Sequence, residues 1–117
     1  MLTSIEMIKA VIDLIVSKKF GRIVNITSGS VKSPIPELGL SNGARSGLTN
    51  FVAGLAREYE QYHVTINNLL PGQFNTARIE ALIEKRAKEN GITSQELRAK
   101  LEKENPSKRL GEIGEFG

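Results

Sequence analysis

Apolar residues recur at helical spacing in the first stretch of the chain, and continuous β-branched runs follow it. The isoleucines of residues 2–18 fall three and four positions apart with charged residues between them, which predicts an amphipathic helix. Residues 22–27 and 63–69 are short and rich in β-branched residues, as is typical of buried strands in a parallel sheet. Residues 43–61 repeat the helical pattern. A strand, a helix and a strand in this order predict a right-handed crossover between parallel strands.

The remaining segments carry different signals. Residues 28–42 are rich in Ser, Pro and Gly, so a loop is expected there. Two charged amphipathic helices are predicted at about residues 77–89 and 94–104, and Thr93 or Ser94 can cap the second of them. The Gly-rich tail after the last helix is expected to end without a stable element.

These elements place the chain in the α/β class. Two parallel strands leave two open sheet edges, and the helices are too few to cover both faces. We therefore expect an incomplete sheet within one partial domain over residues 1–117. Either more chain or another molecule would supply the remaining strands.

Composition narrows the classes of function. Of the 117 residues, 39% are hydrophobic and 25% charged, which is ordinary for a soluble globular protein. A net charge of +3 with both signs mixed, and only 5% aromatic residues, argue against nucleic-acid binding. The chain has no cysteine and one histidine, His63, so no metal site is expected. No apolar run approaches the roughly 20 residues of a membrane span, and we expect a cytoplasmic protein.

Three separated stretches carry a resemblance to a known family. GRIVNITSGS, LSNGARSGLTNFVAGLARE and VTINNLLPGQFNT resemble the catalytic half of short-chain dehydrogenases/reductases, in particular bacterial 3-oxoacyl-acyl-carrier-protein reductases. The resemblance is close over about residues 1–76 and looser through residues 109–112. It implies part of a doubly wound Rossmann-type parallel sheet with helices on its faces. It also implies that residues 77–105 are the helices of a substrate lid.

The first motif is the serine that follows the first strand. The resemblance implies that Ser28 binds the substrate carbonyl or hydroxyl, at the strand end where α/β sheets bind ligands. It also implies that the preceding Thr27 contacts the cofactor. Taken alone, Ser28 is more simply read as the start of a turn. With the other motifs in register, we favour the catalytic role.

The second motif departs from the family. The tyrosine of Tyr-x-x-x-Lys is replaced by Ser41 and the lysine by Arg45. A phenol has a pKa near 10 that a neighbouring ammonium can lower, whereas a serine hydroxyl needs a base beside it. Arg45 can still donate to a ribose hydroxyl and hold positive charge. The implied catalytic group is therefore Ser28, Ser41 and Arg45, and the isolated chain is expected to be inactive.

The third motif is Pro71-Gly72, followed by Phe74 and Thr76. In the family this segment passes the nicotinamide ring, and Gly72 would let the backbone approach a flat ring closely. Alone it is an ordinary turn signal. The implied cofactor is NAD or NADP. The choice between them would be made in the glycine-rich half of the family fold, which has no counterpart in these residues.

Two classes of function remain open. One is an NAD(P)-dependent oxidoreductase that reduces a ketone or oxidises an alcohol, with a 3-oxoacyl compound as a candidate substrate and a variant catalytic group. The other is a non-catalytic binding protein, or a truncated remnant, on the same fold. The resemblance further implies a homodimer or homotetramer through helices 2–18 and 43–61.

Overall fold

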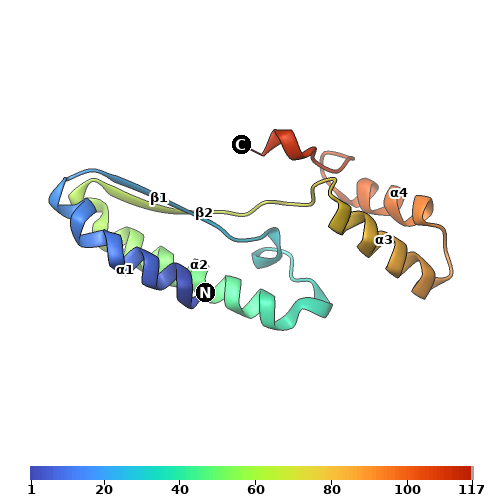
Figure 1. Cartoon of the computed structure of the whole chain (residues 1–117), viewed down its shortest axis with the longest axis horizontal. Coiled ribbons are helices and arrows are strands. Elements are labelled where there is room, and N and C mark those ends of the chain that lie inside the picture. The colour runs from blue at the N-terminus through green and yellow to red at the C-terminus, as the bar shows by residue number, and fades with distance from the viewer. Residues whose placement is uncertain (117) are drawn as a thin grey trace. The chain divides into compact units, whose positions relative to one another are not determined.

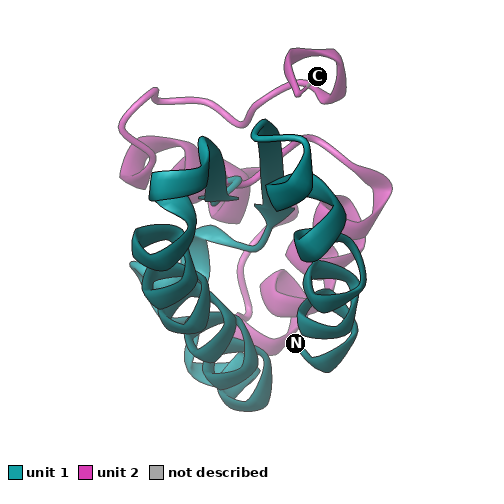
Figure 2. Ribbon diagram, turned by 90° about the vertical axis from the view of Figure 1, so that its left-hand side faces the viewer, with its two compact units in different colours: residues 1–71 teal, residues 72–117 magenta. Residues whose placement is uncertain are grey.

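The computed structural model describes residues 1–116, and the chain divides into two compact units, residues 1–71 and 72–117 (Figures 1 and 2). The first unit contains α1 (Leu2–Ser17), β1 (Gly21–Ile26), α2 (Gly39–Tyr59) and β2 (Val64–Leu69). The second contains α3 (Ala77–Asn90) and α4 (Ser94–Glu104). The predicted α/β class is confirmed. The single partial domain and the lid over residues 77–105 stay predictions.

The two strands pair in parallel, as their sequences predicted. The register runs from Gly21 opposite Val64 to Ile26 opposite Leu69. Helix α2 makes the crossover between them, and α1 lies beside α2 on the same face of the sheet (Figure 1). The carboxyl ends of β1 and β2 consequently lie side by side.

The core of the first unit lies between this sheet face and the two helices. Its buried members come from α1, α2 and β2: Ile8, Ile12, Leu48, Val52, Val64 and Ile66. Val64 is fully buried, and burying one such aliphatic side chain contributes about 1.5–3 kcal/mol. Ile5 and Ile15 pack against the same cluster, so the isoleucine pattern of α1 is confirmed as its core-facing stripe.

The opposite face of the sheet is open within the first unit. Val24 is 60% exposed and Ile26 61% exposed, and the register partner of Ile26, Leu69, is 47% exposed. Paired residues of adjacent strands point to the same side of a sheet. The exposed apolar side chains therefore form one continuous strip, as expected for a sheet covered on one face only.

Helix α2 begins earlier than predicted. The segment over residues 28–42 was expected to be a loop, but it holds the short 3-10 helices Gly29–Val31 and Pro36–Leu38, and α2 starts at Gly39. Pro36 occupies the first turn of its 3-10 helix, where its fixed φ suits helical backbone. Gly39 then continues in right-handed helical conformation, so the chain enters α2 directly.

The prediction for the C-terminal tail was also wrong. A 3-10 helix forms at Ile113–Glu115, and Gly111 makes a parallel bridge with Phe74. The backbone N–H of Asn75 donates to the Gly111 carbonyl at 2.7 Å, and the Gly111 N–H donates to the Gln73 carbonyl at 3.0 Å. The tail thus gains order from the segment that precedes α3, a partner that local sequence does not reveal.

The second unit is a helical pair with well-formed caps. Ile83 and Ala87 of α3 pack on Leu97 of α4. The Thr93 hydroxyl accepts from the Glu96 N–H at 3.1 Å while the Glu96 carboxylate accepts from the Thr93 N–H at 2.8 Å. This capping box selects Thr93 over Ser94 as the cap of α4.

We predict that Gly21→Ala destabilises the first unit. A Cβ at residue 21 would stand 1.9 Å from Cγ2 of Ile15, so α1 must shift away from the start of β1. The expected fall in the free energy of unfolding is about 1–3 kcal/mol. Gly54→Ala is the matched control: it lies in α2 with open space around it, so stability should rise by about 0.5–1 kcal/mol. Urea denaturation of both variants measures these changes in the free energy of unfolding. Native-like stability of Gly21→Ala would contradict the close packing of Ile15 against Gly21.

Candidate active site

The adjoining ends of β1 and β2 form the base of the site. The Thr27 N–H donates to the Leu69 carbonyl at 2.8 Å, and the Gly29 N–H donates to the Pro71 carbonyl at 2.9 Å. These bonds continue the parallel pairing past both strands. They hold Thr27 and Pro71, two residues singled out from the sequence, on neighbouring segments at the carboxyl edge of the sheet, where ligands bind in α/β folds.

Arg45 connects helix α2 to this edge. Its Nε donates to the Ser41 Oγ at 3.2 Å, one helical turn earlier, and its Nη1 donates to the Thr27 carbonyl oxygen. The Thr27 side chain is itself buried, and its hydroxyl donates to the Leu69 carbonyl at 3.3 Å. The guanidinium therefore orients the Ser41 hydroxyl and binds the end of β1 at the same time.

A hollow of about 250 Å³ opens beside these groups. Its lining comes from α1, α2 and the end of β1: Met1, Ser4, Ile26, Thr27, Ser41, Ala44, Arg45 and Leu48. Three of the predicted site residues, Thr27, Ser41 and Arg45, thus face one space. Ser4 was missed from the sequence, because nothing in its neighbourhood separates it from any other serine in a first helical turn.

Ser28 does not line this hollow. Its hydroxyl accepts from the Ser30 N–H at 3.2 Å and caps the 3-10 helix Gly29–Val31. That is the contact expected of a residue that starts a turn. A hydroxyl that accepts in this way can still donate its own hydrogen, so the catalytic role of Ser28 stays a prediction.

Polar contacts continue beneath Arg45 toward the sheet. The Thr49 hydroxyl donates to the Arg45 carbonyl at 2.9 Å, and the Asn68 amide donates to the Thr49 carbonyl at 3.5 Å. The register partner of Asn68 is Asn25. The Asn25 amide nitrogen and the Asn68 amide oxygen are buried, and neither has a hydrogen-bond partner within residues 1–116. A buried donor and acceptor on adjacent strands are suited to be bridged by one water.

The other predicted site residues belong to the second unit. No heavy atom lies within 4 Å of a Cβ built on Gly72, so the space around this glycine is open. The Phe74 ring packs edge-on against Phe116, with 5.4 Å between ring centroids. Thr76 caps α3 by accepting from the Ile79 N–H at 3.3 Å. Phe74 and Thr76 thus have structural contacts of their own, and their roles at a cofactor stay predictions.

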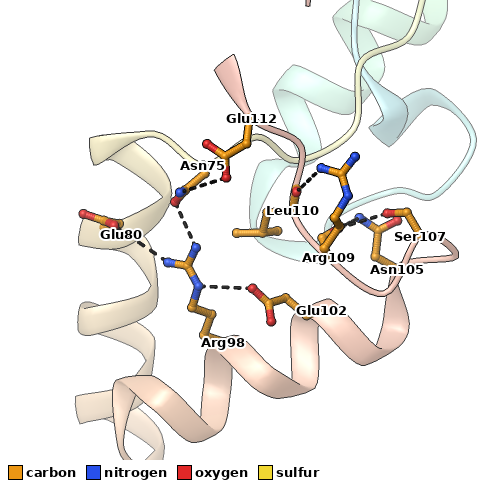
Figure 3. A network of polar contacts seen from close by, with 9 residues as sticks. All are labelled: Asn75, Glu80, Arg98, Glu102, Asn105, Ser107, Arg109, Leu110 and Glu112. Atoms are coloured by element: carbon orange, nitrogen blue, oxygen red, sulfur yellow. Dashed lines mark hydrogen bonds and ion pairs between the residues drawn. The ribbon is translucent and has the colours of Figure 1, made fainter. Parts of the chain in front are cut away.

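An arginine network organises the second unit (Figure 3). Arg98 donates to the Asn75 side-chain oxygen at 3.0 Å and to Glu102 at 3.2 Å, and it lies 3.7 Å from Glu80. These bonds join α4 to α3 and to the segment before it. The network therefore fixes the residues that directly precede Thr76.

A second hollow of about 230 Å³ lies along β2 and contains none of the predicted residues. It is lined by Ala56, Arg57, Glu60, Val64, Thr65, Ile66 and Asn67. Within residues 1–116 no group of three or more His, Cys, Asp or Glu side chains could hold a metal ion. In that same stretch, no helix has the length and apolar character to cross a membrane.

The sequence comparisons decide the family. The profile of the short chain dehydrogenase family matches residues 1–87, which is most of the chain. The chain belongs to the short-chain dehydrogenase family. The match spans the residues that the sequence predicted for the site, from Thr27 to Thr76.

Individual relatives of this short-chain dehydrogenase match different shares of its chain. The NADPH-dependent reductase BacG of Bacillus subtilis is 28% identical over 95% of the chain and 43% of its own length. The 3-oxoacyl-[acyl-carrier-protein] reductase FabG of Haemophilus influenzae is 32% identical over 95% of the chain and 42% of its own length. The 2,3-dihydroxy-2,3-dihydro-p-cumate dehydrogenase of Pseudomonas putida is 37% identical over 51% of the chain and 23% of its own length. The chain spans less than half the length of these relatives.

Solved structures agree on the fold. L-sorbose reductase of Gluconobacter frateurii matches 99% of the chain and 44% of its own with a TM-score of 0.79 at 19% identity. A 3-oxoacyl (acyl-carrier-protein) reductase of Agrobacterium tumefaciens matches 98% of the chain and 42% of its own with a TM-score of 0.77 at 22% identity. The predicted Rossmann-type sheet is confirmed by these neighbours.

The electrostatics of the second unit lead to a prediction about pH. Hydrogen bonds from Arg109, at 2.6 and 2.7 Å, and from the Glu112 N–H lower the pKa of Glu115 from its ordinary 4.5 to about 2. A carboxylate with a lowered pKa stabilises the folded state fully above pH 4.5, and this contribution is lost as pH falls toward 2. NMR titration of the Glu115 side-chain carbon should show its midpoint near 2.

Two controls accompany that titration. Arg109→Gln should return the midpoint of Glu115 toward 4.5, because the main cause of the lowered pKa is removed. Amide NMR spectra of Arg109→Gln are the second control and verify that the variant is folded. A midpoint for Glu115 near 4.5 in the native protein would show that the pair with Arg109 does not form in solution.

Proposed function

We propose that this chain is the catalytic part of an NAD(P)-dependent oxidoreductase that reduces a ketone or oxidises an alcohol. The observation that carries the proposal is the shared hollow: the two positions of the family's Tyr-x-x-x-Lys motif, now Ser41 and Arg45, line one space with Thr27 at the sheet edge. Relatives named as reductases and dehydrogenases support the reaction class. A 3-oxoacyl substrate is supported by the FabG relatives.

Each unit, taken by itself, contains residues suited to part of a nicotinamide cofactor. Arg45 has N–H groups beyond those bonded to Ser41 and Thr27, and these can donate to a ribose hydroxyl. Gly72 leaves room for a flat ring to approach the backbone. When bound, such a cofactor supplies or accepts the hydride. Either NAD or NADP is compatible with these contacts, and relatives with bound NADPH and NAD+ are known.

Ser41 is the group proposed to contact the substrate oxygen. Its Oγ accepts from Arg45, so its own hydrogen is free to be donated to a carbonyl oxygen. The positive charge of Arg45 favours negative charge that develops on that oxygen during reduction. A serine hydroxyl is a weak acid, so we propose that water supplies the proton to the reduced substrate oxygen. Ser41 then only donates a hydrogen bond to that oxygen.

The structure also gives support to a binding role without turnover. Arg45 already bonds the Thr27 carbonyl and Ser41, so part of the motif has a purely structural use in the unliganded chain. A protein that binds a nicotinamide and a carbonyl compound but transfers no hydride is the second candidate. The two candidates differ in turnover and share cofactor binding.

A turnover assay on native and substituted protein separates the candidates. Because the chain by itself is expected to be inactive, the assay uses it joined to the glycine-rich half of the family fold. NADH or NADPH fluorescence should then change on titration, and activated ketones should be reduced. Ser41→Ala should lower kcat by roughly 10²-fold, as for loss of one donor to a developing oxyanion. Ser46→Ala, at an exposed position on the same helix, is the control and should leave kcat unchanged. If the native protein is inactive and Ser41→Tyr with Arg45→Lys restores turnover, the binding role is the correct one.

We further propose that two copies associate through the outer faces of α1 and α2. Met7 (67% exposed), Val11 and Leu14 (59% exposed) form an apolar stripe on α1, and Phe51 is exposed on α2. Residues at i, i+4 and i+7 share one face of a helix. A two-fold interface uses the same patch on both copies, so one such stripe suffices for a homodimer. A homotetramer would need a second patch.

Sedimentation tests this association. Met7→Glu with Leu14→Glu places charges in the middle of the stripe and should convert a dimer to a monomer of half the mass. Asp13→Lys, on α1 outside the stripe and exposed, is the control and should leave the mass unchanged. A monomeric native protein, or a dimer that survives both glutamates, would contradict the proposed interface.

A further inference from the structure

Arg45 has unused donors next to the hollow. Two of its N–H groups are bonded, one from Nε to Ser41 and one from Nη1 to the Thr27 carbonyl. Both acceptors are neutral oxygens, so neither neutralises the charge. Within residues 1–116 no carboxylate forms an ion pair with Arg45. Of the five N–H groups of a guanidinium three remain, so one can donate to the ribose hydroxyl of the proposed cofactor and two are available to a further ligand.

The other polar groups of this hollow are also suited to donate. Ser41 accepts from Arg45, which leaves its hydrogen free. Ser4 contributes a further hydroxyl to the lining. The remaining lining residues, apart from Thr27, are apolar, and none is Asp or Glu. A space with one cation, free hydroxyl hydrogens and no anion favours a negatively charged ligand rich in acceptors.

The second hollow provides an internal contrast. It is lined by Arg57 of the same helix, but Glu60 lies in the same lining. That lining contains an acidic residue as well as an arginine, whereas the described residues that line the hollow beside Arg45 include no acidic residue. Helix α2 thus contributes an arginine to each of two hollows. One lining has balanced charge, and the other has an excess of positive charge.

We infer that the hollow beside Arg45 binds a small anionic oxygen group, and that this group is the carboxylate of an oxo-acid substrate. A guanidinium presents a planar pair of donors that matches a carboxylate, and it does so better than the ammonium of lysine. The hollow of about 250 Å³ has room for a single small group of this kind. The substrate assignment rests on the proposed function, but the anion site does not.

The source of the anionic group is the point that the experiment must resolve. A cofactor phosphate and a substrate carboxylate offer the same chemistry to Arg45. Three probes distinguish them: acetoacetate carries the carboxylate, methyl acetoacetate has the same skeleton without the charge, and inorganic phosphate stands for the cofactor. Binding to the full chain is followed by NMR of the arginine Nε–H signals and by calorimetry.

We expect acetoacetate to bind with a Kd of roughly 1–10 mM, as for a single charged group, and the methyl ester to bind at least tenfold more weakly. Arg45→Gln should weaken acetoacetate binding tenfold or more, and Arg45→Lys should lie between the native protein and Arg45→Gln. Arg57→Gln, which removes the arginine of the charge-balanced hollow, is the matched control and should bind as the native protein does. Amide NMR spectra verify that each variant is folded.

Several outcomes would overturn the inference. Equal binding of acid and ester would show that charge is not recognised, and unchanged binding in Arg45→Gln would place the anion elsewhere. If phosphate binds through Arg45 and acetoacetate does not bind, the carboxylate assignment is contradicted. Failure of the oxidoreductase proposal is recognised separately: acetoacetate would bind through Arg45 while no cofactor binds and no hydride is transferred. Conversely, turnover of esters and oxo acids at equal kcat/KM would leave the oxidoreductase standing and the inference wrong.

Discussion

The bond between the Arg45 guanidinium and the Thr27 carbonyl is the constraint on which the site depends. Thr27 is held at the sheet edge by its N–H bond to Leu69, and Arg45 is held in α2. The bond therefore ties the crossover helix to the carboxyl end of β1. Without it, neither the direction of the Ser41 hydroxyl nor the shape of the hollow beside it would be defined, because both depend on where this turn of α2 lies.

The fold of the first unit could be predicted because its signals are local and periodic. The isoleucines of α1 are three and four positions apart, and they pack where that spacing places them. The β-branched runs form β1 and β2, and the helix between them favours the parallel crossover that the strands adopt. Thr93 and Glu96 likewise form a cap from residues within one turn. In each case the interaction partners lie close in sequence or repeat at a fixed period.

Features that depend on distant partners could not be predicted. The first turn of α2, which begins at Gly39, was predicted as loop because glycine and proline commonly end regular structure. In the structure, the preceding 3-10 helix leads the backbone directly into α2. The order of the tail comes from its bonds to the segment at residues 73–75. For the site, the sequence identified Ser41 and Arg45 by their place in a motif. It did not reveal that Arg45 bonds Thr27, because that contact joins residues 18 positions apart.

The exchange of lysine for arginine changes what this position can do beyond its charge. A lysine ammonium is a compact charge on a flexible stem, while a guanidinium has donors spread over a plane. Arg45 can therefore bond the Thr27 carbonyl and the Ser41 hydroxyl at once and still present donors to a third group. Under the proposed alignment with the family motif, Ser41 stands where the family has a phenol of tunable acidity, and Arg45 provides a rigid, permanently charged donor suited to recognition. Chemistry at the proposed site would then draw its proton from solvent, and we expect its selectivity for substrate to come from charge, because an arginine keeps the positive charge of a lysine and makes its donors directional.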